Sequence, residues 1–407
     1  MGTKVVRLYT EKLESAVSNE NQKELLQLLT ATSKTSNSIL DANLDVEQVD
    51  SLFAQCTESP WAEIGAAYSK VLIYREKKAL VNAFEAQKEL VLNFQRTLPQ
   101  MTRWCLPALV KINDNLRLLA SGADHEMLMK GIPPTDGQRK IEEAATIISR
   151  TFSICITDRN PMSQSKKHAT YKLLGILFRI YFKLRQQNLC KNVLRAIKAA
   201  EVPPLEDFPK SDRVTYLYYI GRLYFAEEQY VKAENLLAQA FMLCRRKDSE
   251  QRLLIMAYLV PLRLMRGCMP TKKLWRDFPR LKVYQKFTEY IRTGNIKEYR
   301  NNIKHLLAGR RTLATGTLFA LERCQALVYR RIFKKVWVFM DRSNRIPMST
   351  FHRAIQISGM RMTSTEVEWI LSDVIARGMM KAYLSHEKGF VVLSNKDPFP
   401  KTYPLPQ

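Results

Sequence analysis

Nine residues from Tyr329 to Trp337, YRRIFKKVW, place four cations among five bulky apolar side chains. If each residue of a helix advances by about 100°, the four cations fall within one arc of about 140°, and the apolar side chains fall on the opposite side. We therefore expect one amphipathic helix, with Phe333 and Val336 in a core. The cationic side has the chemistry to bind phosphate or carboxylate groups.

Cations continue on both sides of this stretch. Residues 300–361 carry thirteen Lys and Arg against two acidic residues, a net charge of 13 − 2 = +11, within a chain whose formal net charge is +25. A solvated helix face usually carries charges of both signs. A segment of this length with one sign more often binds a polyanion. We expect contact with RNA or DNA phosphates, without base readout, from some of this candidate nucleic-acid-binding set: Arg310, Arg311, Arg330, Arg331, Lys334, Lys335, Arg342, Arg345, Lys381 and Lys388.

The alternative for these residues is structural. Arg330 and Lys334 could pair with acidic groups of a neighbouring helix, and the stem of Arg331 could pack on the core. A second basic group lies upstream, interspersed with glutamates, so that a solvated face is about as good an interpretation as an acidic-partner surface. This candidate acidic-partner set comprises Arg222, Lys232, Arg245, Arg246, Lys247 and Arg252.

The sequence offers nothing for catalysis, a metal or a cofactor. No Walker A, dinucleotide-binding or nucleophile-elbow motif occurs, and the five histidines are widely separated. The seven cysteines contain no C-x-x-C pair, which favours free, buried thiols in a reducing compartment. The chain begins without the apolar region of a signal peptide and lacks an apolar run of membrane-spanning length. We therefore expect a protein that is not an enzyme and does not insert into a membrane.

Three helical or mixed regions must position the cations, followed by a tail at 397–407. Residues 1–150 form an N-terminal helical region. Apolar spacings of three and four predict helices in VVRLYTEKLESAV, in KELLQLL and, as a longer pair, in residues 62–98. The polar segment TATSKTSNSIL and the segment SGADHEMLMKGIPPTDGQR, at 121–139, are interpreted as loops.

Residues 151–320 show the spacing of tetratricopeptide-like helical hairpins. In residues 213–244, Gly221 follows Leu217 on one helix, and Ala233 and Leu237 lie on the next, so that the two helices can approach closely. A looser copy surrounds Gly175, and a third helix pair turns at Gly294. Hairpins stacked one on another explain this pattern better than an unspecified helical domain does.

Residues 321–396 predict a winged helix. Helices are expected through the opening stretch, through IPMSTFHRAIQIS with Ser349 as its cap, and from the capping box of Thr363 and Glu366 to Gly378. The segments MKAYLS and FVVLS then predict a hairpin across HEKG. The expected fold class is all-α with a small terminal β-hairpin, in which stacked helical hairpins precede a C-terminal winged helix.

This order of elements resembles the PCI domain, the scaffold module of the proteasome lid, the signalosome and an initiation factor. The blocks FRIYFKLRQQNLCKNVLRAI, RVTYLYYIGR, LVPLRLMRGCMPT, YRRIFKKVW, AYLSH and DPFP are similar to those of the PCI subunits found in a transcription-coupled mRNA-export complex at the nuclear pore. The similarity covers about residues 150–400, whereas residues 1–150 match only in being helical.

The resemblance implies a non-enzymatic subunit of a hetero-oligomer. Its implied partners are a large helical scaffold subunit with its own winged helix, a small acidic protein shared with the proteasome lid, and RNA or DNA. It implies a location in the nucleus at the nuclear pore, with a cytoplasmic pool as an alternative. A PCI subunit of another assembly, namely the signalosome, the proteasome lid or an initiation factor, is the runner-up.

A free-standing regulator that reads a DNA sequence is a third class of function. It would place the third winged-helix helix in the major groove. That helix carries Glu366, Glu368 and Asp373 with Arg377 as its only cation, so phosphates would be repelled. We therefore expect no direct readout of base sequence.

Overall fold

The structure, a computed structural model, describes residues 2–31, 33–42, 44–133, 138–308 and 316–401. The chain divides into two compact units, Met1–Tyr216 and Leu217–Gln407. The boundary lies inside α11 (Lys210–Ala226). The predicted fold class is confirmed, because helices dominate both units and the described strands form one small sheet near the C-terminus. The domain boundaries expected at 150, 320 and 396 stay predictions.

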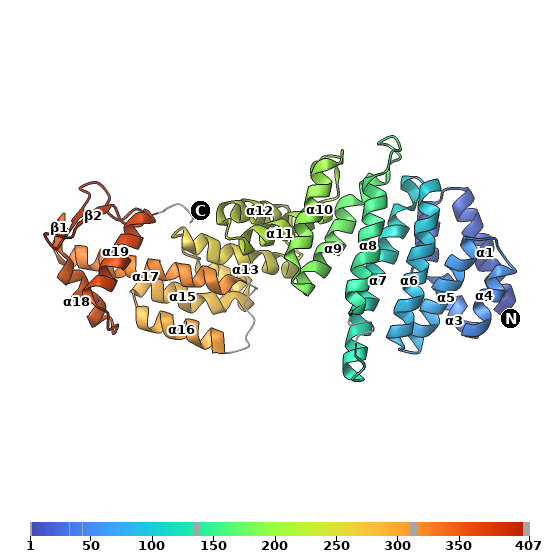
Figure 1. Cartoon of the computed structure of the whole chain (residues 1–407), viewed down its shortest axis with the longest axis horizontal. Coiled ribbons are helices and arrows are strands. Elements are labelled where there is room, and N and C mark those ends of the chain that lie inside the picture. The colour runs from blue at the N-terminus through green and yellow to red at the C-terminus, as the bar shows by residue number, and fades with distance from the viewer. Residues whose placement is uncertain (1, 32, 43, 134–137, 309–315, 402–407) are drawn as a thin grey trace. The chain divides into compact units, whose positions relative to one another are not determined.

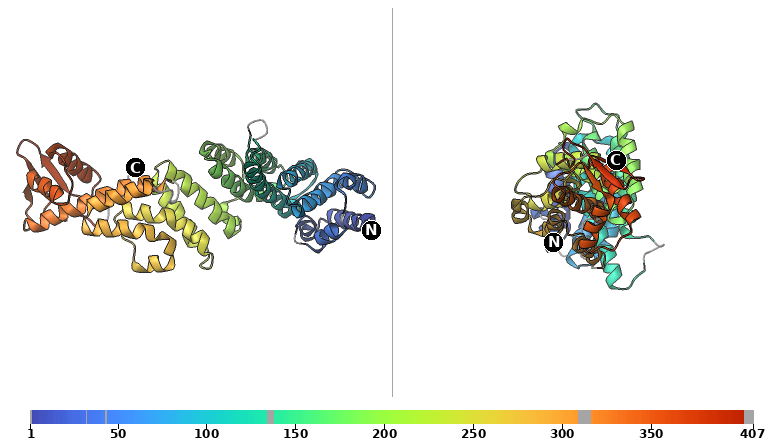
Figure 2. Two further views of the ribbon diagram at one scale, coloured as in Figure 1. Left: turned by 90° about the horizontal axis from the view of Figure 1, so that it is seen from below. Right: turned by 90° about the vertical axis from the view of Figure 1, so that its left-hand side faces the viewer.

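From Val46 to Ala199 the helices of unit 1 run antiparallel and each packs on the next in chain order (Figures 1 and 2). The first helix of the chain packs on the four helices that follow it. The predicted helix pair at 62–98 is confirmed as α5 and α6, which pack along their length. The helices up to α11 are α1 (Gly2–Ser18), α2 (Gln22–Leu28), α3 (Lys34–Asp41), α4 (Val46–Ala54), α5 (Trp61–Glu76), α6 (Leu80–Thr97), α7 (Leu106–Met129), α8 (Lys140–Ile156), α9 (Thr170–Leu184) and α10 (Gln187–Ala199).

Two segments of unit 1 interpreted as loops contain helix, the first over most of its length and the second as far as Met129. The polar segment TATSKTSNSIL contains most of α3, which begins where the Ser33 hydroxyl accepts the backbone N–H of Ser36 and which buries Ile39. The segment at 121–139 contributes the last turns of α7, because Ala123 and Met127 continue its buried stripe. A polar segment with few apolar residues still folds as a helix when those residues lie on one face.

Unit 2 continues the helical hairpins. Its helices after α11 are α12 (Tyr230–Leu243), α13 (Ser249–Met265), α14 (Lys272–Asp277), α15 (Val283–Thr293), α16 (Ile296–Ala308) and α17 (Thr317–Phe339). The close approach expected at Gly221 is present, because a Cβ atom there would lie 2.6 Å from Cγ of Leu237. The turn predicted at Gly294 also forms, with this glycine in the left-handed region (φ +75°) after α15.

The C-terminal part of unit 2 is a winged helix (Figure 1, orange to red). α18 (Met348–Ile357) and α19 (Ser364–Ala376) pack on α17 and on each other, and the capping box of Thr363 and Glu366 is confirmed. The expected cap Ser349 is wrong: Pro347 precedes the first residue of α18 and occupies the cap position. β2 (Ala382–Ser385) and β3 (Phe390–Leu393) form the predicted hairpin, and the three-residue β1 (Arg345–Pro347), which the sequence did not predict, pairs with β3.

Candidate nucleic-acid and partner interfaces

The stretch YRRIFKKVW forms the C-terminal half of α17 and is amphipathic, as its spacing predicts. Tyr329, Phe333 and Val336 are buried, and the Phe333 ring meets the Phe351 ring of α18 edge-on, with centroids 5.4 Å apart. This apolar side fixes α17 between the helical hairpins and the winged helix, because α17 packs on α13, α15, α16, α18 and α19. The position of the cationic side is therefore set by the core.

Arg330 does not lie on an open surface. Its guanidinium donates to the carbonyl oxygen of Met379 (3.0 Å) and to those of Phe399 (3.1 Å) and Pro400. The Phe399 ring packs below the same guanidinium, 5.8 Å from it, and beside the ring of Trp337. Arg330 thus holds the C-terminal segment against α17 through backbone carbonyl oxygens.

Arg331 and Lys335 are exposed and meet the end of α15. Nε of Arg331 donates to the Arg292 carbonyl (2.9 Å), and Nζ of Lys335 donates to the Thr293 carbonyl (2.7 Å). The last carbonyls of a helix lack partners within the helix and carry partial negative charge, so cations are favoured there. Each of these two side chains combines a helix-end contact with an exposed position.

Lys334 is half-buried between these residues. Its burial, followed by repulsion from Arg330 and Arg331, holds the pKa of its ammonium group below the ordinary value, and the attraction of Asp397 does not compensate. Arg330, Arg331 and Lys334 line one pocket together with Arg292 and Lys401. The last two could not be predicted from the spacing of one stretch, because Arg292 lies in the last turn of α15 and Lys401 follows the wing.

The other members of the candidate nucleic-acid-binding set are spread over the winged helix. Arg342 and Arg345 are exposed and lie over the rings of Trp337 (5.9 Å) and Phe390 (4.3 Å). Lys381 and Lys388 are exposed beside β2 and β3. Arg310 and Arg311 lie outside the described residues. Three of the ten residues, Arg330, Arg331 and Lys334, therefore line one pocket. The other members of the set that the structure describes share no pocket with them.

Arg222, from the candidate acidic-partner set, lies among aromatic rings. Its guanidinium is 5.4 Å from the ring centroids of Tyr218 and Tyr258 and 5.7 Å from that of Tyr219. Burial raises the pKa of Tyr258, with the Arg222 charge opposing the shift. Cation–π contacts of this kind bind helices together, so the geometry gives Arg222 a packing role.

Two other members of the candidate acidic-partner set line the same pocket. Arg246 and Arg252 line a pocket of about 450 Å³ with Lys273 and Phe278, near the start of α13. Arg252 stacks 3.9 Å from the Phe241 ring centroid and donates to the Cys244 carbonyl (3.2 Å), which fixes its direction. Lys273 was missed because α14 lies further along the chain. The remaining members are exposed: Lys232, Arg245 and Lys247.

The third winged-helix helix, α19, uses its charges internally. Glu366 closes the capping box, Nδ1 of His386 lies 2.8 Å from a Glu368 oxygen, and Arg377 pairs with Asp373 (2.8 Å). Arg377, which caps the C-terminal end of α19, is thus already paired with an acid of that helix. Trp369 of α19 and Tyr383 of β2 are instead strongly exposed, at 74% and 63%.

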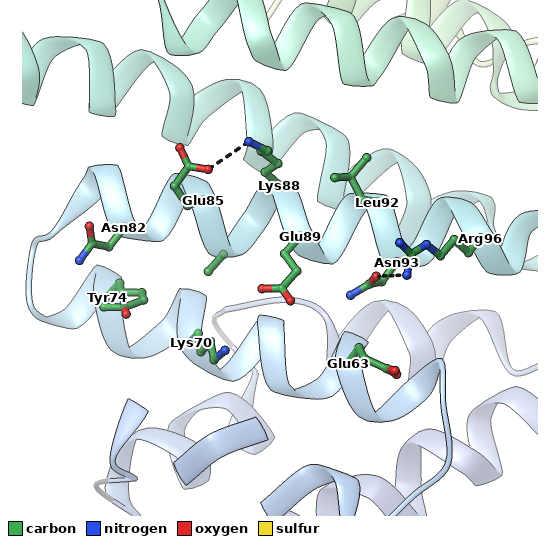
Figure 3. Close-up of a pocket in the computed structure, with 11 residues that line it drawn as sticks. Glu63, Lys70, Tyr74, Asn82, Glu85, Lys88, Glu89, Leu92, Asn93 and Arg96 are labelled. Carbon is green, nitrogen blue, oxygen red and sulfur yellow. Dashed lines mark hydrogen bonds and ion pairs between the residues drawn. The ribbon is translucent and has the colours of Figure 1, made fainter. Parts of the chain in front are cut away.

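Unit 1 contains a groove of mixed charge. It has a volume of about 770 Å³ between α5 and α6, and Figure 3 shows side chains of both signs along it. Lys70 already pairs with Asp50 (2.6 Å), and Arg96 donates to Asn93 (3.3 Å). The arrangement is typical of a solvated face and carries no charge excess that would select a polyanion.

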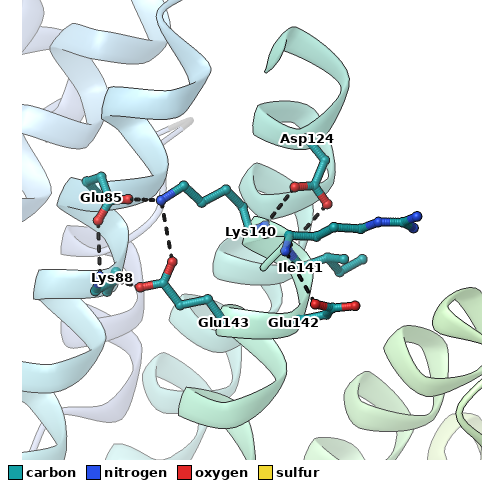
Figure 4. A network of polar contacts seen from close by, with 8 residues as sticks. Glu85, Lys88, Asp124, Lys140, Ile141, Glu142 and Glu143 are labelled. Carbon is teal, nitrogen blue, oxygen red and sulfur yellow. Dashed lines mark hydrogen bonds and ion pairs between the residues drawn. The ribbon is translucent and has the colours of Figure 1, made fainter. Parts of the chain in front are cut away.

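Next to this groove, a polar network joins α6, α7 and α8 (Figure 4). Nζ of Lys140 lies 2.6 Å from Glu85, which also pairs with Lys88 (3.2 Å), and Asp124 accepts the backbone N–H groups of Lys140 (2.7 Å) and Ile141 (3.3 Å). Burial alone would raise the pKa of Glu85, but hydrogen bonds from Lys140 and Lys88 outweigh it and hold that pKa below its ordinary value. The network is structural, because its charges satisfy one another.

The described residues contain no group of three His, Cys, Asp or Glu side chains that could hold a metal ion. All seven cysteines are free, and five of them are buried. Within the described part of the chain, no helix is both long enough and apolar enough to span a bilayer.

The described architecture is that of helical hairpins ending in a winged helix, and the PCI-domain family model matches residues 288–395, from α15 to just beyond β3. The class of protein is therefore a PCI-domain protein, and the resemblance to the PCI domain is confirmed.

Comparison with curated proteins shows to which family within this class the chain belongs. The chain is 34% identical over 418 aligned residues to "Protein CSN12 homolog" of Schizosaccharomyces pombe, covering 97% of each chain. It is 35% identical over 343 residues to the protein of the same name from Mycosarcoma maydis, covering 79% of this chain and 76% of the relative. It is 28% identical over 368 residues to "PCI domain-containing protein 2" of Xenopus laevis, covering 89% and 90%. The chain belongs to this family of PCI-domain proteins. None of the three names states a catalytic activity.

Proposed function

We propose that the chain is a non-enzymatic scaffold subunit of a nuclear-pore-associated complex for transcription-coupled mRNA export. In this complex it pairs with a large helical scaffold subunit that has its own winged helix and with a small acidic protein. It also contributes a basic surface that contacts RNA or DNA without reading sequence. The observation that carries this proposal is a winged helix whose third helix is acidic, while three cations of its first helix, α17, line a pocket at the junction with α15.

The contact with the scaffold subunit is assigned to the sheet and α19. β2 is an edge strand of the order β1-β3-β2, and an edge strand exposes backbone groups that another chain can pair with. Trp369 and Tyr383 lie on α19 and β2, which pack together. Exposed aromatic side chains of this size are enriched at protein interfaces. We assign the scaffold subunit's winged helix to this side.

The small acidic protein is assigned to the pocket of Arg246, Arg252 and Lys273. Three cations here face one carboxylate, Asp277, so an acidic peptide would find an excess of positive charge and the Phe278 ring for an apolar residue. Glu227 and Glu228 between α11 and α12, and Glu234 on α12, disfavour such a peptide on that hairpin.

Co-expression of the three chains tests the assembly. The double variant Trp369→Ala, Tyr383→Ala is expected to lose the scaffold subunit from affinity purification, whereas Ile357→Ala, which removes a side chain that is 86% exposed at the end of α18, is expected to retain it. Arg246→Glu combined with Lys273→Glu should lose the acidic protein, and Lys198→Glu on α10 should not. Failure of the wild-type chain to bind either partner would contradict the proposal.

Identification of the subunits that copurify from cells decides between the assemblies. Export-complex subunits support the proposal, whereas subunits of the signalosome, the proteasome lid or an initiation factor would assign the chain to the corresponding PCI assembly. Tight binding to one DNA site over a scrambled site would indicate the sequence-specific regulator instead.

A further inference from the structure

The pocket at the junction of α15 and α17 is amphiphilic as well as basic. It has a volume of about 410 Å³, within the range of small-molecule sites. Ile291 and Leu327, which are 3% and 2% exposed, form an apolar floor beside Met269. The pocket is also lined by five cations from three segments of unit 2: Arg292, Arg330, Arg331, Lys334 and Lys401.

Backbone contacts hold several of these cations in place. Arg292 donates to the Pro270 carbonyl (3.2 Å), and Nε of Arg331 donates to the Arg292 carbonyl (2.9 Å). A guanidinium group carries five N–H donors, and each of these bonds uses one. Neither Arg292 nor Arg331 has a carboxylate within ion-pair distance among the described residues. Both therefore retain charge and donors for a ligand.

Lys334 shows that the positive charge in the pocket is unbalanced. Burial and the charges of Arg330 and Arg331 lower the pKa of its ammonium group, although Asp397 acts in the opposite direction. An anion bound among these three side chains would relieve this repulsion. A hydrated cation, or a wholly apolar ligand, would not.

We propose that this pocket receives one unpaired nucleotide of a single strand, with its phosphate among Lys334, Arg331 and Arg292 and its base against Met269 and the apolar floor. The inference deepens the proposed function and rests on it. A phosphate alone would leave the apolar floor unused, and a base inside a duplex is paired and stacked and so does not enter a pocket. The pocket accordingly selects single strands over duplexes.

The test measures fluorescence anisotropy of the full chain, together with its scaffold partner, on a labelled oligouridine and on a labelled duplex. Lys334→Gln is expected to weaken single-strand binding about tenfold, since one charge-assisted hydrogen bond is lost. Lys388→Gln, which removes one exposed charge on the wing, is the matched control and should change affinity for both substrates equally and less. Uridine monophosphate should displace the single strand more strongly than inorganic phosphate or polyglutamate.

Met269→Ala is the second variant, and thermal denaturation verifies the fold of each. Met269→Ala should weaken the binding of the single strand and of uridine monophosphate. It should leave competition by inorganic phosphate unchanged. The nucleotide pocket would be overturned if Lys334→Gln and Lys388→Gln lost equal affinity for both substrates, or if polyglutamate displaced the single strand as strongly as uridine monophosphate. Either result would leave the proposed function standing. If neither wild-type nucleic-acid complex forms, the nucleic-acid part of the proposed function fails as well.

Discussion

At the scale of single residues, the guanidinium of Arg330 bonds three carbonyl oxygens of segments that follow it far along the chain. Arg330→Met should leave these carbonyls without their donor and destabilise unit 2 by about 1–3 kcal/mol. Lys335→Gln, which removes an exposed ammonium group from the C-terminal end of α15, should cost about 0.3–1 kcal/mol. Chemical denaturation of both variants measures the difference. Equal losses would mean that the C-terminal segment is held by Phe399 packing alone.

Phe333 lies at the centre of the winged-helix core, with no exposed surface. Phe333→Ala removes its contact with Phe351 and leaves a cavity, so the free energy of unfolding should fall by about 3–5 kcal/mol. Phe339→Ala, on the same helix but 82% exposed, is the control and should cost little. A small effect at Phe333 would contradict the assignment of this helix face to the core.

At the scale of elements, α11 and α12 approach closely because Gly221 has no side chain. Gly221→Ala places a Cβ atom 2.6 Å from Cγ of Leu237, and we expect a destabilisation of about 1–3 kcal/mol. Leu237→Ala in the same chain should remove the clash, so the double variant should be less destabilised than the sum of the two single variants. Strict additivity in thermal denaturation would contradict the packing.

The turn between α8 and α9 depends on a buried ion pair. Nζ of Lys166 lies 3.0 Å from Asp158, with side chains 3% and 7% exposed, and it also donates to the Met101 carbonyl (2.7 Å). Lys166→Met would leave the Asp158 carboxylate buried without its cation, at a cost of about 3–5 kcal/mol. The double variant Lys166→Met, Asp158→Asn should recover part of this loss, as measured by urea denaturation.

The same pair predicts a pH dependence. Burial would raise the pKa of Asp158, but hydrogen bonds from the Lys166 backbone, its ammonium group and Ser165 lower it overall. A depressed carboxylate pKa contributes stability above the unfolded value of about 3.9, and this contribution is lost as pH falls through the folded value. The stability advantage of the wild type over Asp158→Asn should therefore shrink below about pH 4. A constant difference across that range would contradict the pairing.

Element types could be predicted wherever apolar periodicity and caps agreed. The Thr363 capping box, the Gly294 turn and the strands around HEKG are examples, because local side chains alone specify them. α3 was missed because only a few apolar residues mark its buried face. β1 was missed because three residues carry no periodicity and the strand exists only through pairing with β3.

At the scale of the whole molecule, the candidate site depends on contacts that one stretch of sequence does not contain. Arg331 and Lys334 could be predicted from YRRIFKKVW, whereas Arg292 and Lys401 join them only after α15 and the C-terminal segment pack on α17. The same packing places Arg330, which was expected to contact phosphate, against the C-terminal segment, where it donates to backbone carbonyl oxygens. Charge patterning thus predicted where cations are concentrated along the chain, and tertiary packing determined which of them line one pocket.

We propose that the cations of α17 contact nucleic acid within an assembled complex, and a salt titration of that complex is the decisive experiment. Arg331→Ala, Lys334→Ala and Lys335→Ala together should weaken binding similarly for all sequences and reduce the slope of log affinity against log salt by about 2–3 units. A matched triple of exposed cations in unit 1, Lys183, Arg195 and Lys198, should leave the slope unchanged when replaced by Ala. Unchanged affinity and slope for the α17 variant would contradict the claim and assign nucleic-acid binding to the partner subunit.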